Sequence, residues 1–307
     1  KNTNLPLYLR TGIASLFAQE GVFMFADKKW GPMKVYNMFN NIGRNGQTVA
    51  TAADANIKTM ADLKGKRVTW VKGSPALNGN MAGFLAFGGL TWDDVIKVEV
   101  SGYGASANAV INGQADASMG SSVSSIFNKT NASPRGLFFP PMPHNDEVSW
   151  KRAIATAPHF AKAVVTNFVG SSDSNKSFEG MNYPYPIFVT LEKTSEDLSY
   201  HLTEAVMNNY DQFKDSGPGM DGYQLSNQNF SWIFPYHPGA VKFYKKKGVW
   251  TSKHDKHNAN LIKRQDVLAK AWQKTLKANL SGDAFKKKWL ENRASALKAA
   301  GMPNAYN

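Results

Sequence analysis

Small polar residues follow three successive predicted strands, each at a turn that opens a helix. These residues are Gly73 and Ser74, then Tyr103 and Ala105, then Ser121 and Ser122. In an open parallel sheet such turns lie together at the carboxyl edge, where ligands bind. Helix N-termini at that edge present free N–H groups and a partial positive charge, which suit a carboxylate or another small anion. Ordinary helix caps could explain each turn singly, but the three together predict a ligand-binding edge.

Two tyrosines extend this candidate site. Tyr183 and Tyr185 flank a proline at the start of a later predicted strand, and either could form a wall of the site or offer a hydroxyl to the ligand. A place in the core explains each of them equally well. Arg67 and Arg135 lie in the same half of the chain, and the sequence leaves open whether they face the ligand edge. We expect an anionic ligand.

One segment offers an alternative as an enzyme. Residues 102–107 read GYGASA and match the pattern G-x-G-x-x-G/A after a strand, which in dinucleotide-binding proteins places a pyrophosphate on a helix N-terminus. The acidic residue expected about 20 positions later is missing. Asp116 comes too early, 14 residues after Gly102, and lies inside the next predicted strand. A tight turn between strand and helix is the other explanation. An NAD(P)-dependent enzyme that uses Gly102–Ala107 therefore stays as an alternative function.

The remaining chemistry-bearing residues do not assemble into a catalytic set. The chain has no cysteine, which removes disulfides, thiolate nucleophiles and cysteine-based metal sites. Ser74 lies outside the pattern of a nucleophile elbow. His254 and His257 have the spacing of a metal-binding pair, but they sit in a lysine-rich stretch and no further ligand is near. We expect no enzyme activity, no metal and no cofactor.

The elements that must position the candidate residues alternate between strand and helix. We predict strands near 68–71, 98–100 and 116–119, and helices over 76–89 and 105–111. This alternation favours right-handed crossovers and a parallel sheet. Later we predict a mainly irregular segment over 128–150 and a helix around 151–166. A strand follows over 185–191, and its neighbouring prolines favour an edge or crossover position.

The basic residues are concentrated at the end of the chain. The net charge is +13, yet residues 242–307 hold 16 of the basic and only 4 of the acidic side chains, a net charge of +12. Two amphipathic helices are predicted there, with Trp272 and Trp289 on their apolar faces. Aromatic residues on buried faces argue against base stacking, so we expect no nucleic-acid partner. A polyanion-binding tail is the alternative. No run of about 18 apolar residues is present, so no membrane helix is expected.

Several segments resemble extracytoplasmic solute-binding proteins. Residues 56–68 (NIKTMADLKGKRV) resemble a segment of these proteins, and Gly73-Ser74, residues 112–117 (NGQADA) and the strand around Phe188 follow in the expected order. Those features alone fit several families, ABC-type receptors included. Residues 234–240 (FPYHPGA), continued by 242–244 and 248–250, are narrower and resemble the signature of the TAXI group of TRAP-transporter receptors.

This resemblance implies an α/β fold of the two-lobed periplasmic binding protein type (type II-like), with mostly parallel sheets flanked by helices. Lobe I would comprise 1–62 and 190–250, lobe II 63–189, and 251–307 would form a basic helical extension packed on the body. The resemblance implies a monomeric periplasmic receptor that closes on a small organic acid or amino acid in the cleft between its lobes. It would deliver this ligand to the membrane permease of a TRAP transporter. The alternative is an ABC-type substrate-binding protein.

Overall fold

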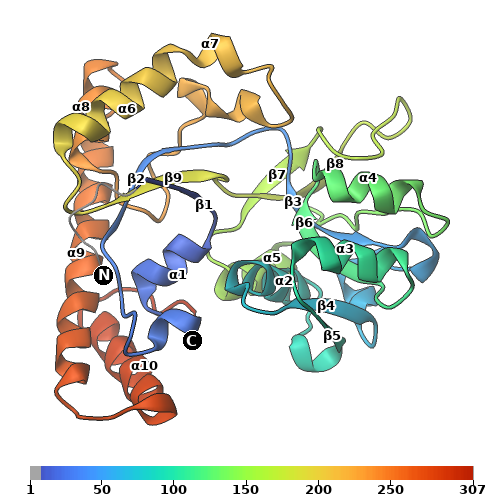
Figure 1. Ribbon diagram of the computed structural model, residues 1–307, viewed down its shortest axis with the longest axis horizontal. Helices are drawn as coiled ribbons and strands as arrows, with labels where there is room; N and C mark the ends of the chain where they lie inside the picture. The colour runs from blue at the N-terminus through green and yellow to red at the C-terminus, as the bar shows by residue number, and fades with distance from the viewer. Residues whose placement is uncertain (1–7, 307) are drawn as a thin grey trace. The chain divides into compact units, whose positions relative to one another are not determined.

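The computed structural model describes residues 8–306 and divides them between two compact units. Unit 1 comprises the chain up to Asn41, Pro184–Asp215 and Tyr223 to the end, and unit 2 comprises Ile42–Tyr183 and Ser216–Gly222. Figure 1 shows the path of the chain. Both units combine strands with helices, and long helices follow at the C-terminal end. The predicted α/β fold class in two units, with helices flanking the sheets, is therefore confirmed.

Unit 1 is built on a three-stranded antiparallel sheet in the order β1-β9-β2. Its elements are β1 (Tyr8–Thr11), α1 (Ala14–Glu20), β2 (Val35–Asn40), β9 (Ile187–Leu191), α6 (Glu196–Asn208), α7 (Tyr210–Phe213), α8 (Pro238–Lys246), α9 (Ser252–Leu276) and α10 (Gly282–Ala299). The expectation that β9 lies at an edge or crossover is wrong, because this strand is central. Pro184 and Pro186 precede its first residue, so neither removes a donor from the ladder.

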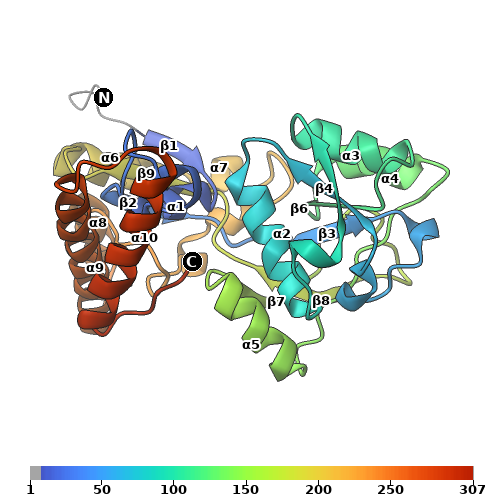
Figure 2. The same cartoon turned by 90° about the horizontal axis from the view of Figure 1, so that it is seen from below.

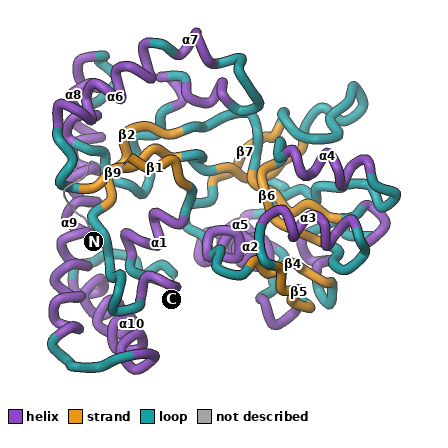
Figure 3. The backbone as a smooth tube through the Cα atoms, in the orientation of Figure 1, coloured by secondary structure: helices purple, strands orange, loops and turns teal. Residues whose placement is uncertain are grey.

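Unit 2 is built on a six-stranded mixed sheet in the order β5-β4-β6-β3-β8-β7. Its elements are β3 (Gln47–Thr51), β4 (Arg67–Val71), α2 (Pro75–Phe87), β5 (Ile96–Val100), α3 (Tyr103–Ile111), β6 (Ala117–Ser121), α4 (Ser125–Ala132), α5 (Glu147–Thr156), β7 (Ala161–Val165) and β8 (Phe178–Asn182). Helices α2 and α5 cover one face of the sheet and α3 and α4 the other, as Figure 2 shows. Figure 3 colours the strands and helices apart.

The parallel part of this sheet is the part that the alternation of elements predicted. Strand β4 pairs in parallel with β5 and with β6. The other pairings, β3 with β6 and β8 and β7 with β8, are antiparallel, so the sheet is less parallel than expected. The helix predicted around 151–166 ends earlier, at Thr156, and residues 161–165 form β7. Pairing with β8 stabilises that segment as a strand.

The described units differ from the predicted lobes in several bounds: unit 2 ends at Tyr183 rather than at 189, and it also includes Ser216–Gly222. We predicted that the second lobe starts at residue 63, whereas unit 2 starts at Ile42 because β3 lies between β6 and β8 in its sheet. The predicted extension, 251–307, belongs to unit 1. Its apolar side chains pack into one cluster with Ala26: Leu268, Ala271, Trp272, Phe285, Trp289 and Leu297.

An ion-pair cluster ties this extension to α1. Glu20 is 2% exposed, and its carboxylate accepts hydrogen bonds from Arg264 (2.7 and 2.8 Å) and from Arg293 (2.6 Å). Burial alone would raise the pKa of Glu20, but the two guanidinium groups hold it below its ordinary value. The Trp289 indole N–H also donates to the carbonyl of Gly21. Polar contacts therefore fix the position of α9 and α10 in unit 1.

Candidate functional site

Three helices of unit 2 begin at the same edge of the sheet. Because β4, β5 and β6 run parallel, their carboxyl ends lie together, and each is followed at once by a turn and a helix. Gly73 and Ser74 precede α2, Gly102 precedes α3, and Ser122 and Ser124 precede α4. The first N–H groups of each helix have no partner within that helix. We call this edge, with Gly73, Ser74, Tyr103, Ala105 and Ser121, the ligand edge.

The serine before α2 does not act as an ordinary cap. Ser74 occupies the N-cap position of α2, and within the described residues its side chain makes no capping hydrogen bond. Ser195, in contrast, caps α6 by accepting from the N–H of Leu198. The hydroxyl of Ser74 is half-buried and remains available at the edge. The side chain of Ser74 therefore does not cap α2, although capping was the competing explanation for this residue.

Tyr103 lies across a glycine of β6. A Cβ at Gly120 would collide with the Tyr103 hydroxyl and stand 2.8 Å from the ring of Phe127. The face of β6 that Gly120 presents is therefore filled by α3 and α4. Tyr103 is half-buried, while Ala105 follows it in the first turn of α3. The lack of a side chain at Gly120 is what lets the tyrosine approach the strand.

The two serines after β6 have different environments. Ser122 is fully buried: its hydroxyl donates to the Asn167 carbonyl (2.8 Å) and accepts from the Gly46 N–H (3.1 Å). This serine holds two loops of unit 2 together, and its hydroxyl is already occupied. Ser121 is half-buried, and its hydroxyl accepts one hydrogen bond, from the Asn45 amide (3.3 Å). Of the two, Ser121 is the candidate for ligand contact.

Gln47 is a polar residue at this edge that the sequence did not single out. It is the first residue of β3 and lies directly opposite Ser121 in the antiparallel ladder, so both side chains point to the same face of the sheet. The side chain is 4% exposed, and its amide nitrogen has no hydrogen-bond partner among the described residues. An unsatisfied buried donor costs about 1–3 kcal/mol, which a bound acceptor would offset.

Tyr183 belongs to a buried polar chain on the same face as Gln47. Met181 of β8 is the register partner of Gln47, and Tyr183 follows two residues later. The Tyr183 hydroxyl accepts from the Asn80 amide (3.0 Å), and the Asn80 carbonyl oxygen lies 2.7 Å from Nε2 of His159. Burial lowers the pKa of His159 to about 3, so the ring is neutral at pH 7 and its Nε2–H donates to Asn80. Tyr183 is 3% exposed.

Tyr185 belongs to the other unit. A Cβ on Gly12, the residue that follows β1, would lie 2.9 Å from one of its ring carbons, so Tyr185 packs beside Gly12 of unit 1. The structure thus brings together Gly73, Ser74, Tyr103, Ala105, Ser121 and Ser122, with Tyr183 at the same edge, and it places Tyr185 in a different unit.

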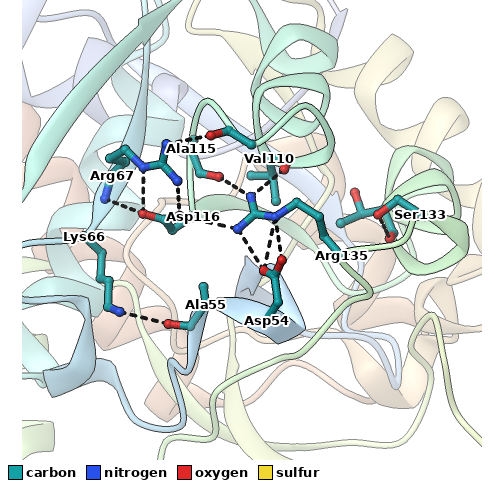
Figure 4. A network of polar contacts seen from close by, with 11 residues as sticks. Asp54, Ala55, Lys66, Arg67, Val110, Ala115, Asp116, Ser133 and Arg135 are labelled. Atoms are coloured by element: carbon teal, nitrogen blue, oxygen red, sulfur yellow. Dashed lines mark hydrogen bonds and ion pairs between the residues drawn. The ribbon is translucent and has the colours of Figure 1, made fainter.

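Both arginines are engaged at the opposite edge of the sheet. Arg67 begins β4 and binds the Asp116 carboxylate through two side-chain hydrogen bonds of 3.0 and 2.6 Å. Arg135 holds Asp54 in a bidentate pair and donates to the carbonyls of Val110 and Ala115 (Figure 4). Neither guanidinium faces the ligand edge, so an anion bound there would depend on N–H groups and neutral side chains.

The enzyme and metal alternatives gain no support from these contacts. Asp116, the nearest acid after residues 102–107, is held by Arg67 and Arg135 at the far edge and cannot reach a ribose at the near one. His254 Nδ1 accepts from the Thr251 N–H, and His257 Nε2 lies 2.7 Å from the Trp232 carbonyl. Over residues 8–306 no cluster of three or more potential metal ligands was found. No described helix is long and apolar enough to cross a membrane.

These features define an α/β protein of two units, one of which carries a polar edge that suits a small ligand. The chain belongs to the NMT1-like family, whose model matches residues 14–248. No curated protein matches it.

Solved structures of transport proteins resemble parts of the chain. One, on glutathione import through GshT and the cystine ABC importer TcyBC of Streptococcus mutans, is 15% identical with a TM-score of 0.37, over 62% of this chain and 65% of that one. A periplasmic binding protein of an ABC transporter from Brucella ovis, with glutathione bound, is 13% identical with a TM-score of 0.34, over 69% and 60%. The alkanesulfonate-binding protein SsuA from Xanthomonas axonopodis pv. citri, bound to MOPS, is 17% identical with a TM-score of 0.37, over 84% and 71%. The chain thus spans less than two thirds of the first two.

Proposed function

We propose that this protein is an extracytoplasmic solute receptor that binds a small organic ligand and hands it to a membrane permease. The observation that carries the proposal is that α2, α3 and α4 begin at one edge of unit 2. Their N-termini form a site for a carboxylate or another small anion without any charged side chain. Membership of the NMT1-like family and the resemblance of residues 56–68 and 234–250 to solute-binding proteins support it.

In this proposal the ligand edge of unit 2 supplies the polar contacts. Helix N–H groups near Gly73 and Ala105 bind the anionic group, while Ser74 and Ser121 donate from their hydroxyls. Gln47 uses the amide nitrogen that has no other partner among residues 8–306. Tyr103 and Tyr183 form walls of the site. The ligand-bound form would be the one that the permease recognises, and no covalent step is needed.

Calorimetry with a panel of small carboxylates, amino acids and sulfonates tests the ligand class. We expect at least one anionic ligand to bind, with affinity reduced about tenfold or more in Gln47→Leu. Gln114→Leu is the matched control, because Gln114 is exposed in a turn at the other end of the sheet. Binding of a sugar or a cation, with no anion bound, would refute the anionic site. Native mass spectrometry of the purified protein would identify a ligand that co-purifies.

The class of permease is a separate proposal with two candidates. The solved structures named above include receptors of ABC importers, whereas residues 234–250 resemble the TAXI receptors of TRAP transporters. Uptake of the identified ligand by vesicles that contain either kind of permease decides between them. ATP dependence indicates an ABC importer, and dependence on an ion gradient indicates a TRAP transporter.

The NAD(P)-dependent enzyme remains the rival class. It requires residues 102–107 to contact a pyrophosphate, and both Gly102 and Gly104 have open space where a Cβ would lie. A rise in melting temperature with millimolar NAD(H) or NADP(H) would favour it. We expect no such rise.

A further inference from the structure

The long helix α9 carries a row of lysines on the side that faces away from the core. Lys256, Lys263, Lys270 and Lys277 follow one another at intervals of seven residues, with Lys277 at the C-cap, and Lys274 lies between the last two. A seven-residue spacing drifts by only about 20° per repeat on an α-helix, so these side chains stay on one face. At 1.5 Å per residue the row is about 30 Å long. We call these five residues the lysine row.

The row is opposite the face that α9 packs on unit 1. Gln265, Leu268, Trp272 and Thr275 are buried, and Gln265 donates to the Val35 carbonyl and to Gln19. All five lysines of the row are exposed. Figures 1 and 2 both show α9 as one unbroken helix at the margin of its unit. The fold therefore holds the lysines in a straight line at the surface.

Among the described residues, no acidic side chain pairs with a lysine of the row. Helix α9 contains two acids, and both are engaged elsewhere: Asp255 pairs with Lys245 (3.0 Å), and Asp266 pairs with Lys34 (3.0 Å). The one arginine of the helix, Arg264, turns inward to Glu20. Within the described part of the chain, none of the five lysines of the row takes part in an ion pair. Five uncompensated charges on a rigid line form a cationic surface that needs an anionic counterpart.

We propose that the lysine row docks the protein on an anionic lipid surface. This proposal goes beyond solute binding, and its choice of partner rests on the proposed function, since a receptor for a permease acts beside a membrane. Lysines on one face of a helix attract anionic headgroups, each strengthening binding by roughly a factor of five when it lies near the surface. The apolar side of α9 is buried on unit 1, so docking is electrostatic and without insertion. The row contains no exposed aromatic side chain on which bases could stack, which disfavours a single-stranded nucleic acid.

Co-sedimentation of the full chain with lipid vesicles tests the proposal. We expect binding to vesicles of phosphatidylcholine with 30% phosphatidylglycerol at 50 mM NaCl and no binding to pure phosphatidylcholine. Binding should weaken strongly at 200 mM NaCl, because exposed charges are then screened beyond about 7 Å. The triple variant K256Q/K263Q/K270Q should lose about 100-fold in partition coefficient.

The matched control is K129Q/K151Q/K176Q, which removes three exposed lysines from unit 2 and leaves the row intact. It should bind vesicles within about threefold of the wild type. An equal loss in both variants would show that net charge alone is sensed, and it would overturn the proposal. So would tighter binding to duplex DNA than to anionic vesicles at equal salt. Ligand affinity, measured by calorimetry, should be the same in all three proteins, so failure of lipid docking and failure of solute binding are distinguishable.

Discussion

Arg67 and Asp116 form an ion pair that links the first residue of β4 to the residue just before β6. The carboxylate accepts from Nε and Nη2 of the guanidinium and from the backbone N–H of Arg67, and Arg135 lies 3.5 Å away. Burial would raise the pKa of Asp116, but its hydrogen bonds to Arg67 and the charges of both arginines lower it overall. The pair therefore holds the amino ends of these strands together, at the edge away from the predicted ligand.

The first prediction concerns Asp116→Asn. We expect a loss of about 1–3 kcal/mol in the free energy of unfolding at pH 7, since a hydrogen-bonded charge pair is broken. A carboxyl group whose pKa is lower in the folded than in the unfolded protein stabilises the fold at pH values above its unfolded pKa, near 3.9. This contribution is lost as the pH falls through the pKa of the folded state. Urea unfolding should therefore show a smaller difference between wild type and variant at pH 3 than at pH 7. Asp93→Asn, at an exposed carboxylate 4.0 Å from Lys97, should cost under about 0.5 kcal/mol.

The second prediction concerns Glu20→Gln. Removing this charge leaves Arg264 and Arg293 without their buried counter-ion, and breaking such a cluster typically costs about 3–5 kcal/mol. Amides of α9 and α10 should lose protection in hydrogen exchange before those of unit 2. The matched control is Glu291→Gln, which breaks an exposed pair with Lys288. If both variants are equally stable, the buried cluster does not anchor the extension.

The third prediction compares two glycines near Tyr103. Gly120→Val places a side chain where the Tyr103 hydroxyl and Phe127 now lie, so the tyrosine must move. We expect ligand affinity to fall about tenfold or more and stability to fall by about 1–3 kcal/mol, as in overpacked cores. Gly104→Ala, in α3 with open space around it, should instead raise helix stability by roughly 0.5–1 kcal/mol. Calorimetry and urea unfolding measure both effects.

The fourth prediction concerns the neutral His159. Its pKa is lowered to about 3 by burial, while the unfolded chain takes up this proton near pH 6.5. The stability that depends on the neutral ring is therefore present above pH 6.5 and is lost at about 1.4 kcal/mol per pH unit as the pH falls toward 3. His159→Gln should flatten the decline of stability between pH 6 and 4. Urea unfolding at a series of pH values measures this slope, and an unchanged slope in the variant would contradict the prediction.

Local patterns were enough to predict the order β4-α2-β5-α3-β6 and the two helices of the tail. Each of these elements has its own periodicity, and glycines follow several of them, so the signal lies within a short window. Six of the eight candidate residues come from the turns between these strands and helices. They lie near one edge of unit 2 because the carboxyl ends of parallel strands meet at the same edge.

Gln47 could not be found in this way. Gln47 lies at the candidate site only because it pairs with Ser121 in the antiparallel sheet. The two residues are 74 positions apart, and such long-range pairing produces no local pattern in the sequence. Strand β7 was missed for the same reason: β8 stabilises it across an intervening loop. Likewise, the ion pairs of Arg67 with Asp116 and of Arg135 with Asp54 form only in the folded protein and could not be predicted from the sequence.

The division of unit 1 among distant segments has a consequence for the order in which the chain matures. During synthesis β1 and β2 emerge from the ribosome well before β9, the strand with which both of them pair. Glu20 likewise emerges some 240 residues before Arg264. Unit 2, whose strands all lie between residues 47 and 182, can complete its sheet while unit 1 still lacks its central strand. During synthesis β1 and β2 must therefore wait for their partner strand after unit 2 has completed its sheet.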